Sequence, residues 1–243
     1  MTGTVPIGTV LNAAGILLGG VLGLTLKKPL SAPRQTALKG LLGVATVYAG
    51  LRLTLISLGP GWGPAFQQLL IVVLALIAGR LTGRLLRLQK LFNRLGRYAN
   101  EKYSQAGPAR PNRLSEGFVT CTVLFCAGPL AIPGAIQDGL GGHWPALGLK
   151  ALMDGLATMA FVPVFGWGVI LSVVPVLAWQ GLLTLGAAAL AGVLGGPLIN
   201  SINATGGLLV FCVALMIFEF KKIELADYLP SLAFAPLWTW LWP

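Results

Sequence analysis

Long apolar runs, separated by short polar connections, follow one another along this chain. The first three runs are Gly8 to Leu26, Thr36 to Ser57 and Phe66 to Leu86. Each is close to the roughly 20 residues that a helix needs to cross about 30 Å of hydrocarbon. Apolar and polar residues do not alternate within the runs, so they predict transmembrane helices rather than barrel strands.

The middle of the chain contains apolar runs that are interrupted. A fourth run extends from Ser115 to Ile136, a loop is expected from Gln137 to Trp144, and Pro145 begins the fifth span. The stretch from Leu147 to Gln180 is too long for one ordinary helix, so we expect one long broken span or a re-entrant hairpin followed by a span. The residues expected to break these helices are Pro129, Pro133, Gly166 and Pro175.

Three further runs complete the chain, namely Leu182 to Leu198, Thr205 to Phe220 and the short Leu229 to Trp242. The polar residues between the first two predict an outer turn from Leu198 to Ala204. With the broken stretch counted once, the chain has about eight spans.

Gly192-Val193-Leu194-Gly195 repeats the sequence of Gly20-Val21-Leu22-Gly23. In both places a short polar turn follows a helix rich in small residues. The two hairpins are expected to cross the membrane in opposite senses, which predicts an inverted repeat of the kind found in secondary transporters.

Glycines recur at four-residue spacing in two of the predicted spans. Gly15, Gly19 and Gly23 lie in the first, and Gly79 and Gly83 in the third. Small residues at this spacing allow two helix backbones to approach closely. The sequence allows the partner helix to belong to the same bundle or to a second copy of the chain. A homo-oligomer is therefore one of the two alternatives.

The composition supports a membrane protein. Of 243 residues, 56% are hydrophobic and 10% are charged, whereas soluble domains are about a quarter charged. A soluble core of this size does not hide so much apolar surface. We therefore expect residues 1–243 to form a single integral membrane domain, all-α and polytopic, with lipid as its main partner.

The positive charge is concentrated in one connection. The net charge is +10, and nine of the seventeen Lys and Arg residues lie between Arg80 and Arg113. Residues 84–113 predict a basic amphipathic connector on the cytoplasmic side, in contact with anionic lipids rather than nucleic acid. Glu219 to Asp227, with two lysines, is placed on the same side, so both termini are expected outside.

Lys150 and Asp154 are the charged residues that the pattern does not explain. They are four residues apart and share a helical face. A helix that starts at Pro145 places Asp154 roughly 13 Å along its axis, near the bilayer midplane. Asp154 is expected to bind a cation or proton, with Lys150 as its switchable partner. The alternative is an ion pair that only locks two helices together.

Other polar residues are candidates for the same site. The additional solute- or ion-binding candidates are Asn12, Gln137 and Asp138, and the gating or secondary candidates are Glu116, Arg52 and Asn203. All of them except Gln137 also have a structural interpretation. Asn12 would make an interhelical hydrogen bond, and Arg52 would lie at the interface. A turn or a helix cap would explain Asp138, Glu116 and Asn203.

The sequence does not predict an enzyme, a metal site or a cofactor. One histidine and three cysteines in apolar runs make a poor zinc site. No Gly-rich loop precedes a Lys-Ser or Lys-Thr pair, so a phosphate-binding loop is not expected. No Ser, His and Asp set is suitably placed for nucleophilic catalysis.

Several motifs resemble one family of bacterial inner-membrane proteins. They are Ser115-Glu116-Gly117-Phe118-Val119-Thr120, Gly128-Pro129, Gln137-Asp138-Gly139-Leu140, Lys150 with Asp154-Gly155, Gln180-Gly181 and Ala204-Thr205-Gly206-Gly207. These stretches resemble the YqgA/YdfK-like family, a domain of unknown function, over nearly the whole chain. The family commonly has an acid in place of His143 and a hydroxyl residue in place of Ala151. The resemblance implies a multi-pass protein of the bacterial inner membrane and supplies no substrate.

These features together predict a secondary transporter or exporter of a small polar or ionic solute, coupled to a proton or cation through Lys150 and Asp154. A channel-like pore of the same architecture is the first alternative. A membrane scaffold without transport activity, in which the Lys–Asp pair is structural, is the second.

Overall fold

The computed structural model describes residues 6–25, 32–104, 114–128 and 130–242, and every regular element in these ranges is a helix. The first four are α1 (Ile7–Thr25), α2 (Ala32–Ile56), α3 (Trp62–Leu85) and α4 (Leu88–Ser104). The central ones are α5 (Leu114–Cys126), α6 (Ala131–Gly141), α7 (Pro145–Phe165), the 3-10 helix η1 (Trp167–Ser172) and α8 (Val173–Ala191). The last are α9 (Gly196–Ile217), the 3-10 helix η2 (Leu225–Tyr228) and α10 (Ser231–Leu241).

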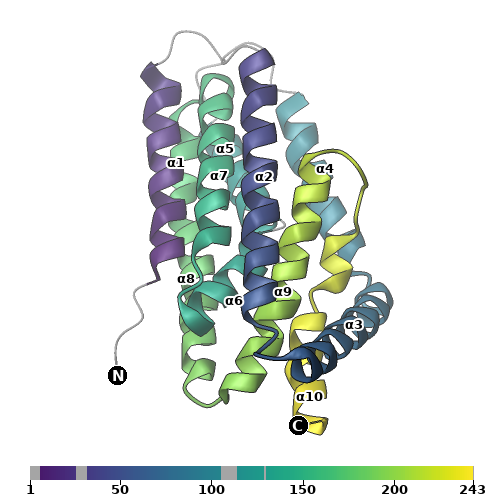
Figure 1. The fold of residues 1–243 in the computed structure, drawn as a ribbon. Coiled ribbons are helices and arrows are strands. Elements are labelled where there is room, and N and C mark those ends of the chain that lie inside the picture. Colours follow the sequence, from purple (N-terminus) through teal and green to yellow (C-terminus); the bar gives the residue numbers. More distant parts are fainter. Residues whose placement is uncertain (1–5, 26–31, 105–113, 129, 243) are drawn as a thin grey trace.

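The helices form a bundle in which α1, α2, α7, α8 and α9 lie side by side, whereas α3 crosses the lower end of the bundle at a steep angle (Figure 1). Helix α1 packs mainly on α7, α2 on α9, and α6 on α8. Helix α1 begins and α10 ends toward the same end of the bundle (Figure 1). The predicted all-α membrane helix bundle is confirmed.

Five described helices are long and apolar enough to cross a membrane, or six when the bent pair α5 and α6 is counted as one span. The five are α1, α3, α7, the continuous segment Trp167–Ala191 and α9. About eight were expected. The difference lies in α2, whose apolar part is only Gly40–Ile56, and in α10, which has only 11 residues.

The central breaks differ in part from the prediction. Gly166, with a φ of 77°, separates α7 from η1. Pro175 lies in the first turn of α8 and Pro133 in the first turn of α6, so neither interrupts the helix that contains it. A first turn tolerates proline because its backbone N–H groups have no partner within the helix. Pro129 lies outside the described residues, between two helices bent by 59°.

Two predicted connections are wrong in their bounds. The expected loop from Gln137 to Trp144 is helical as far as Gly141, within α6. The expected outer turn from Leu198 to Ala204 belongs to α9, and the turn itself lies earlier, at residues 192–195. The outer turn was misplaced because buried polar side chains in α9 resemble a turn in the sequence alone.

The glycines of α1 explain its close contact with α7. A Cβ on Gly15 or Gly19 would collide with the carbonyl oxygen of Ala151 or Gly155, respectively, and one on Gly23 would lie 2.9 Å from the carbonyl oxygen of Met159. The predicted close packing of this stripe is therefore confirmed within the bundle. The two backbones touch because these glycines have no side chains.

We expect Gly19→Ala to destabilise the protein by about 1–3 kcal/mol, the usual cost of inserting atoms into a well-packed contact. The control is Gly186→Ala on α8, because a Cβ there meets nothing within 4 Å and alanine favours a helix over glycine. Thermal unfolding in detergent measures both. Equal melting temperatures for the two variants would contradict the α1–α7 contact.

Candidate functional site

The two charged residues of α7 form a buried ion pair. Lys150 Nζ lies 2.6 Å from Asp154 Oδ2, and the side chains are only 4% and 9% exposed. A spacing of four residues places both on one face of α7. An ion pair inside an apolar bundle keeps its charge only when further polar groups satisfy it.

Two neighbouring helices supply those polar groups. The amide nitrogen of Asn12, in α1, donates to Asp154 Oδ2 at 3.1 Å and to Gln180 Oε1, in α8, at 3.0 Å. The hydroxyl of Thr158 donates to the backbone carbonyl of Asp154 at 2.7 Å. We call the side chains of Asn12, Lys150, Asp154 and Gln180 the polar cluster.

The ammonium group of Lys150 reaches the break between α5 and α6. It lies 6.0 Å from the centre of the Phe125 ring, and a Cβ built on Gly128 would lie 3.3 Å from Nζ. The carbonyl oxygen of Leu124 would lie 3.4 Å from that same Cβ position on Gly128. A helix carries partial negative charge at its C-terminus, so the end of α5 stabilises the cation.

Two amide atoms of the polar cluster are buried without a hydrogen-bond partner in the described part of the chain, namely Asn12 Oδ1 and Gln180 Nε2. Buried polar groups in native proteins are nearly always hydrogen-bonded. One of the two atoms accepts and the other donates, so the cluster offers both kinds of bond to a small polar solute or to water.

Asp138 lies in a different environment from Asp154. Its Oδ2 accepts hydrogen bonds from the backbone N–H groups of Gly8 at 3.0 Å and Thr9 at 3.4 Å. These two residues form the start of α1, so Asp138 caps that helix and lies at the positive end of its dipole. The hydroxyls of Thr9 and Thr184, 3.0 Å apart, join α1 to α8 beside it.

The other sequence candidates are dispersed. Gln137 is fully buried, its two amide atoms lack partners among the described residues, and it lines a groove that Arg52 also lines. Asn203 is buried in α9. Glu116 lies in the first turn of α5, where an acid suits the helix dipole.

Of the predicted binding residues, the structure therefore brings together only Lys150, Asp154 and Asn12. Gln180 was absent from the predicted set although it is a fourth member of the polar cluster. The available signal was an amide within the apolar segment Trp167–Ala191.

A cavity approaches Lys150 from one side of the bundle. It has a volume of about 170 Å³ and lies between α4, α6, α9 and η2. Gly128 forms part of its wall, and Lys150 Nζ lies beside that glycine. Gly128 therefore links the wall of this cavity to the surroundings of Lys150.

His143 lies in the connection between α6 and α7. Burial lowers the pKa of His143, and the nearby Arg52 guanidinium lowers it further. Both effects favour the neutral imidazole. His143 Nδ1 is buried and has no partner among the described residues.

No three His, Cys, Asp or Glu side chains within the described ranges lie close enough to hold a metal ion. The three cysteines are free thiols. Cys121 is buried, and Cys126 and Cys212 are half-buried.

Comparison with known proteins identifies relatives over almost the full chain. Residues 7–240 match the family described as "Protein of unknown function (DUF554)". The uncharacterized membrane protein YdfK of Bacillus subtilis is 29% identical over 230 residues, covering 95% of this chain and 94% of YdfK. The uncharacterized protein YqgA of Escherichia coli is 29% identical over 231 residues, covering 94% of each chain. No solved structure matches. The predicted family resemblance is confirmed.

We expect Lys150→Met to destabilise the protein by about 3–5 kcal/mol, because Asp154 would remain buried without its counter-ion. Replacing both residues, as Lys150→Met with Asp154→Leu, should restore most of the loss. The control is Arg84→Met, which removes an ion pair whose side chains are 55% and 54% exposed and should cost less than about 1 kcal/mol. Thermal unfolding in detergent compares them, and similar losses for Lys150→Met and Arg84→Met would contradict a buried pair.

Asp138→Ala should destabilise the protein by about 0.5–2 kcal/mol, the usual cost of losing a helix cap. Asp138→Asn should lose less, because the amide oxygen still accepts a hydrogen bond. The exposed acid Glu101 provides the control variant Glu101→Ala. If thermal unfolding shows the Asn and Ala variants of Asp138 to be equally unstable, the carboxylate does more than cap α1.

Proposed function

The chain belongs to the DUF554 family, and we propose from the polar cluster on α7 that it is a secondary transporter or exporter of a small polar or ionic solute in the bacterial inner membrane. A proton or cation gradient drives transport through Lys150 and Asp154. Ionisable residues within membrane spans are rare and usually belong to solute paths or proton relays. The protein is not proposed to be an enzyme.

One observation supports this function above the others. The polar cluster combines an ion pair with a free acceptor on Asn12 and a free donor on Gln180. A purely structural network normally satisfies all its members, because an unpaired polar atom in a low-dielectric interior is costly. The polar cluster therefore resembles a binding site in its closed state.

The interrupted helix beside the cluster also supports transport. Transporters commonly bind ions and solutes where helices are broken within the membrane. Here Lys150 lies against the break between α5 and α6, and the 170 Å³ cavity reaches the other side of that break. Protonation of Asp154 would weaken its bond to Lys150 and free the ammonium group to bind an anionic solute or to move toward the cavity.

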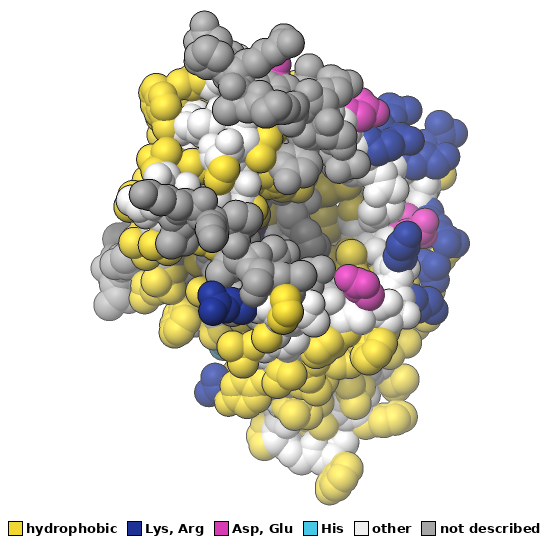
Figure 2. Space-filling model, turned by 90° about the horizontal axis from the view of Figure 1, so that it is seen from above, with side chains coloured by type: hydrophobic (Ala, Val, Ile, Leu, Met, Phe, Trp, Pro, Cys, Tyr) yellow, Lys and Arg dark blue, Asp and Glu magenta, His cyan; other side chains and the backbone are white. Residues whose placement is uncertain are grey.

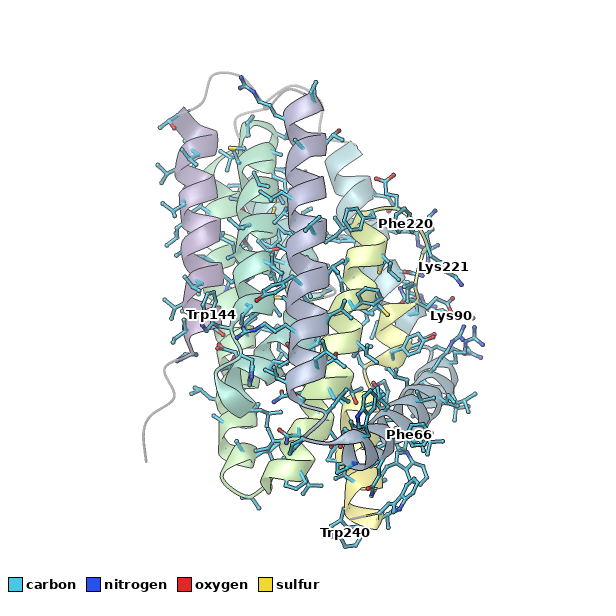
Figure 3. All side chains as sticks on the ribbon, viewed as in Figure 1. Phe66, Lys90, Trp144, Phe220, Lys221 and Trp240 are labelled. Carbon is cyan, nitrogen blue, oxygen red and sulfur yellow. The ribbon has the colours of Figure 1, made fainter. Side chains whose placement is uncertain are left out.

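The same cavity lies on the basic side of the molecule. Figure 2 shows Lys and Arg side chains gathered along one side, and Lys90 and Lys221 lie on one side of the bundle in Figure 3. The N–H of Gln89, in α4, donates to Asp227 Oδ1 at 2.8 Å. This hydrogen bond joins the basic connector of residues 84–113 to the connection of residues 219–227. The positive-inside rule assigns this side to the cytoplasm and both termini to the outside.

The amphipathic helix α4 contributes to that surface. It packs on α5 and η2, with Leu88, Phe92 and Leu95 half-buried. Exposed basic residues are Lys90, Arg94 and Arg97 in α4 and Arg87 immediately before it. They are suited to contact anionic headgroups of the inner leaflet.

A scaffold without transport activity is the second candidate, because the short Lys150–Asp154 contact is almost sealed from solvent. The variant Lys150→Met with Asp154→Leu separates the two functions. In a scaffold this variant is stable and fully functional, whereas in a transporter it is stable and inactive. A channel-like pore would instead give single-channel conductance without gradient coupling.

We expect Asp154→Asn to abolish solute flux coupled to a proton or sodium gradient in proteoliposomes. The amide keeps the shape of the carboxylate and a hydrogen-bonding oxygen, but it neither carries charge nor exchanges a proton. A panel of small amino acids, organic acids and inorganic ions provides the solutes, and currents on a solid-supported membrane provide the measurement. Thermal unfolding of the same samples reports whether the variant is folded.

The matched control for flux is Asp227→Asn, which also replaces a carboxylate by an amide. Asp227 is a buried acid that caps α4 and lies outside the polar cluster. The control variant should retain most of the wild-type flux. Coupled flux that is unchanged in folded Asp154→Asn would remove Asp154 from the transport mechanism.

A further inference from the structure

A groove with a volume of about 580 Å³ lies between α1 and α2, and α7 forms its floor. Its walls are largely apolar, with Leu11 and Leu18 from α1 and Leu53 and Ile56 from α2. Leu18 is 65% exposed. The volume falls within the roughly 300–1,000 Å³ of pockets that hold organic ligands, and the groove opens on the outside of the bundle, where lipid surrounds the protein.

The groove also contains a small set of polar groups. They are the guanidinium of Arg52, the imidazole of His143 and the amide of Gln137. No carboxylate pairs with Arg52 in the described ranges. His143 Nδ1 and both amide atoms of Gln137 are buried without partners among the described residues. The cation of Arg52 beside an apolar channel favours an occupant that is both amphipathic and anionic.

The groove is separate from the polar cluster. Among its lining residues on α7 are Gly148 and Leu152, which at 100° per residue lie about 120–160° around the helix from Lys150 and Asp154. An occupant of the groove therefore does not contact the ion pair directly.

Aromatic residues indicate the depth in the membrane at which the polar groups of the groove lie. Tyr48 and Trp144 line the groove and are exposed, and Trp144 lies near the lower end of α1 and α7 (Figure 3). Tyr and Trp favour the level of the lipid headgroups. Arg52 is one turn of α2 from Tyr48, so its guanidinium lies within reach of lipid phosphates.

We propose that this groove binds one phospholipid, with its phosphate on Arg52 and His143 and an acyl chain along α1 and α2. This site is additional to the proposed solute site. Arg52 holds the phosphate through charge-assisted hydrogen bonds, the strongest kind available to it. A second copy of the chain fits less well, because the described residues show no carboxylate in the groove to match Arg52.

The test measures phospholipid on the intact protein by native mass spectrometry. Wild-type protein purified in mild detergent should retain one phospholipid per chain. Delipidated protein is then titrated with palmitoyl-oleoyl phosphatidylglycerol and, separately, with diacylglycerol, which lacks the phosphate. Arg52→Gln should weaken phosphatidylglycerol binding by about tenfold or more, the usual effect of losing a hydrogen bond to a charged group, and should leave diacylglycerol binding unchanged.

Two further variants distinguish the groove from the rest of the surface. Ala49→Trp fills the groove and should weaken binding of both lipids. Arg84→Gln removes an exposed cation elsewhere and should weaken neither. Equal phosphatidylglycerol binding by wild-type, Arg52→Gln and Ala49→Trp proteins, each folded by thermal unfolding, would overturn the proposal.

The alternative occupant, a second copy of the chain, is tested in the bilayer. A cysteine introduced at Leu18, on a background without the native cysteines, should not form disulfide-linked dimers, because lipid covers the groove. Efficient dimer formation together with loss of retained lipid would identify a second copy as the occupant and overturn the lipid assignment.

Discussion

The contact between α1 and α7 is the constraint on which the polar cluster depends. Gly15 and Gly19 have no side chains where α1 meets the backbone of α7, so the two helices touch directly. At this separation the Asn12 amide reaches Asp154 at 3.1 Å. N–H···O hydrogen bonds span about 2.7–3.2 Å, so this bond is already near the long end of the range and a methyl group between the helices would withdraw Asn12 from the carboxylate. Packing in α1 therefore controls the chemistry available at Asp154.

The break between α5 and α6 solves the electrostatic problem that Lys150 creates. A charge in hydrocarbon costs about 3 kcal/mol even on the mildest scale, and Asp154 carries a charge of its own that also needs compensation. The C-terminus of α5 provides partial negative charge beside Lys150, and the Phe125 ring provides an aromatic face. A continuous helix in place of α5 and α6 would have no terminus at this depth. Gly128, at the same break, also lines the 170 Å³ cavity, so the region that stabilises the cation adjoins that cavity.

The hydropathy pattern predicted most of the helices, and residue spacing predicted the ion pair of α7, because both depend on residues close in sequence. The spans that became α1 and α3 agree with the structure within a few residues, and α7 begins at Pro145 as predicted. A spacing of four residues was enough to pair Lys150 with Asp154. The sequence did not separate Asp138 from Asp154, because the cap on α1 joins residues 130 positions apart. It also placed Asn203 in an outer turn, because hydropathy does not distinguish a polar residue facing water from one facing the interior of a bundle. Gln180 was missed for the same reason.

Small residues on one face of α7 have two different effects. Ala151 and Gly155 admit the backbone of α1 and close the bundle around the polar cluster. Gly148 and Ala151 also line the groove between α1 and α2, where they leave space for an occupant. Because α7 is the common wall, a rotation or shift of α7 that moves Lys150 and Asp154 relative to Asn12 and Gln180 also changes the shape of the groove. A molecule bound in the groove with different affinities for the two positions of α7 would therefore shift the equilibrium between them, so the lipid and the ion pair are coupled through the helix that they share.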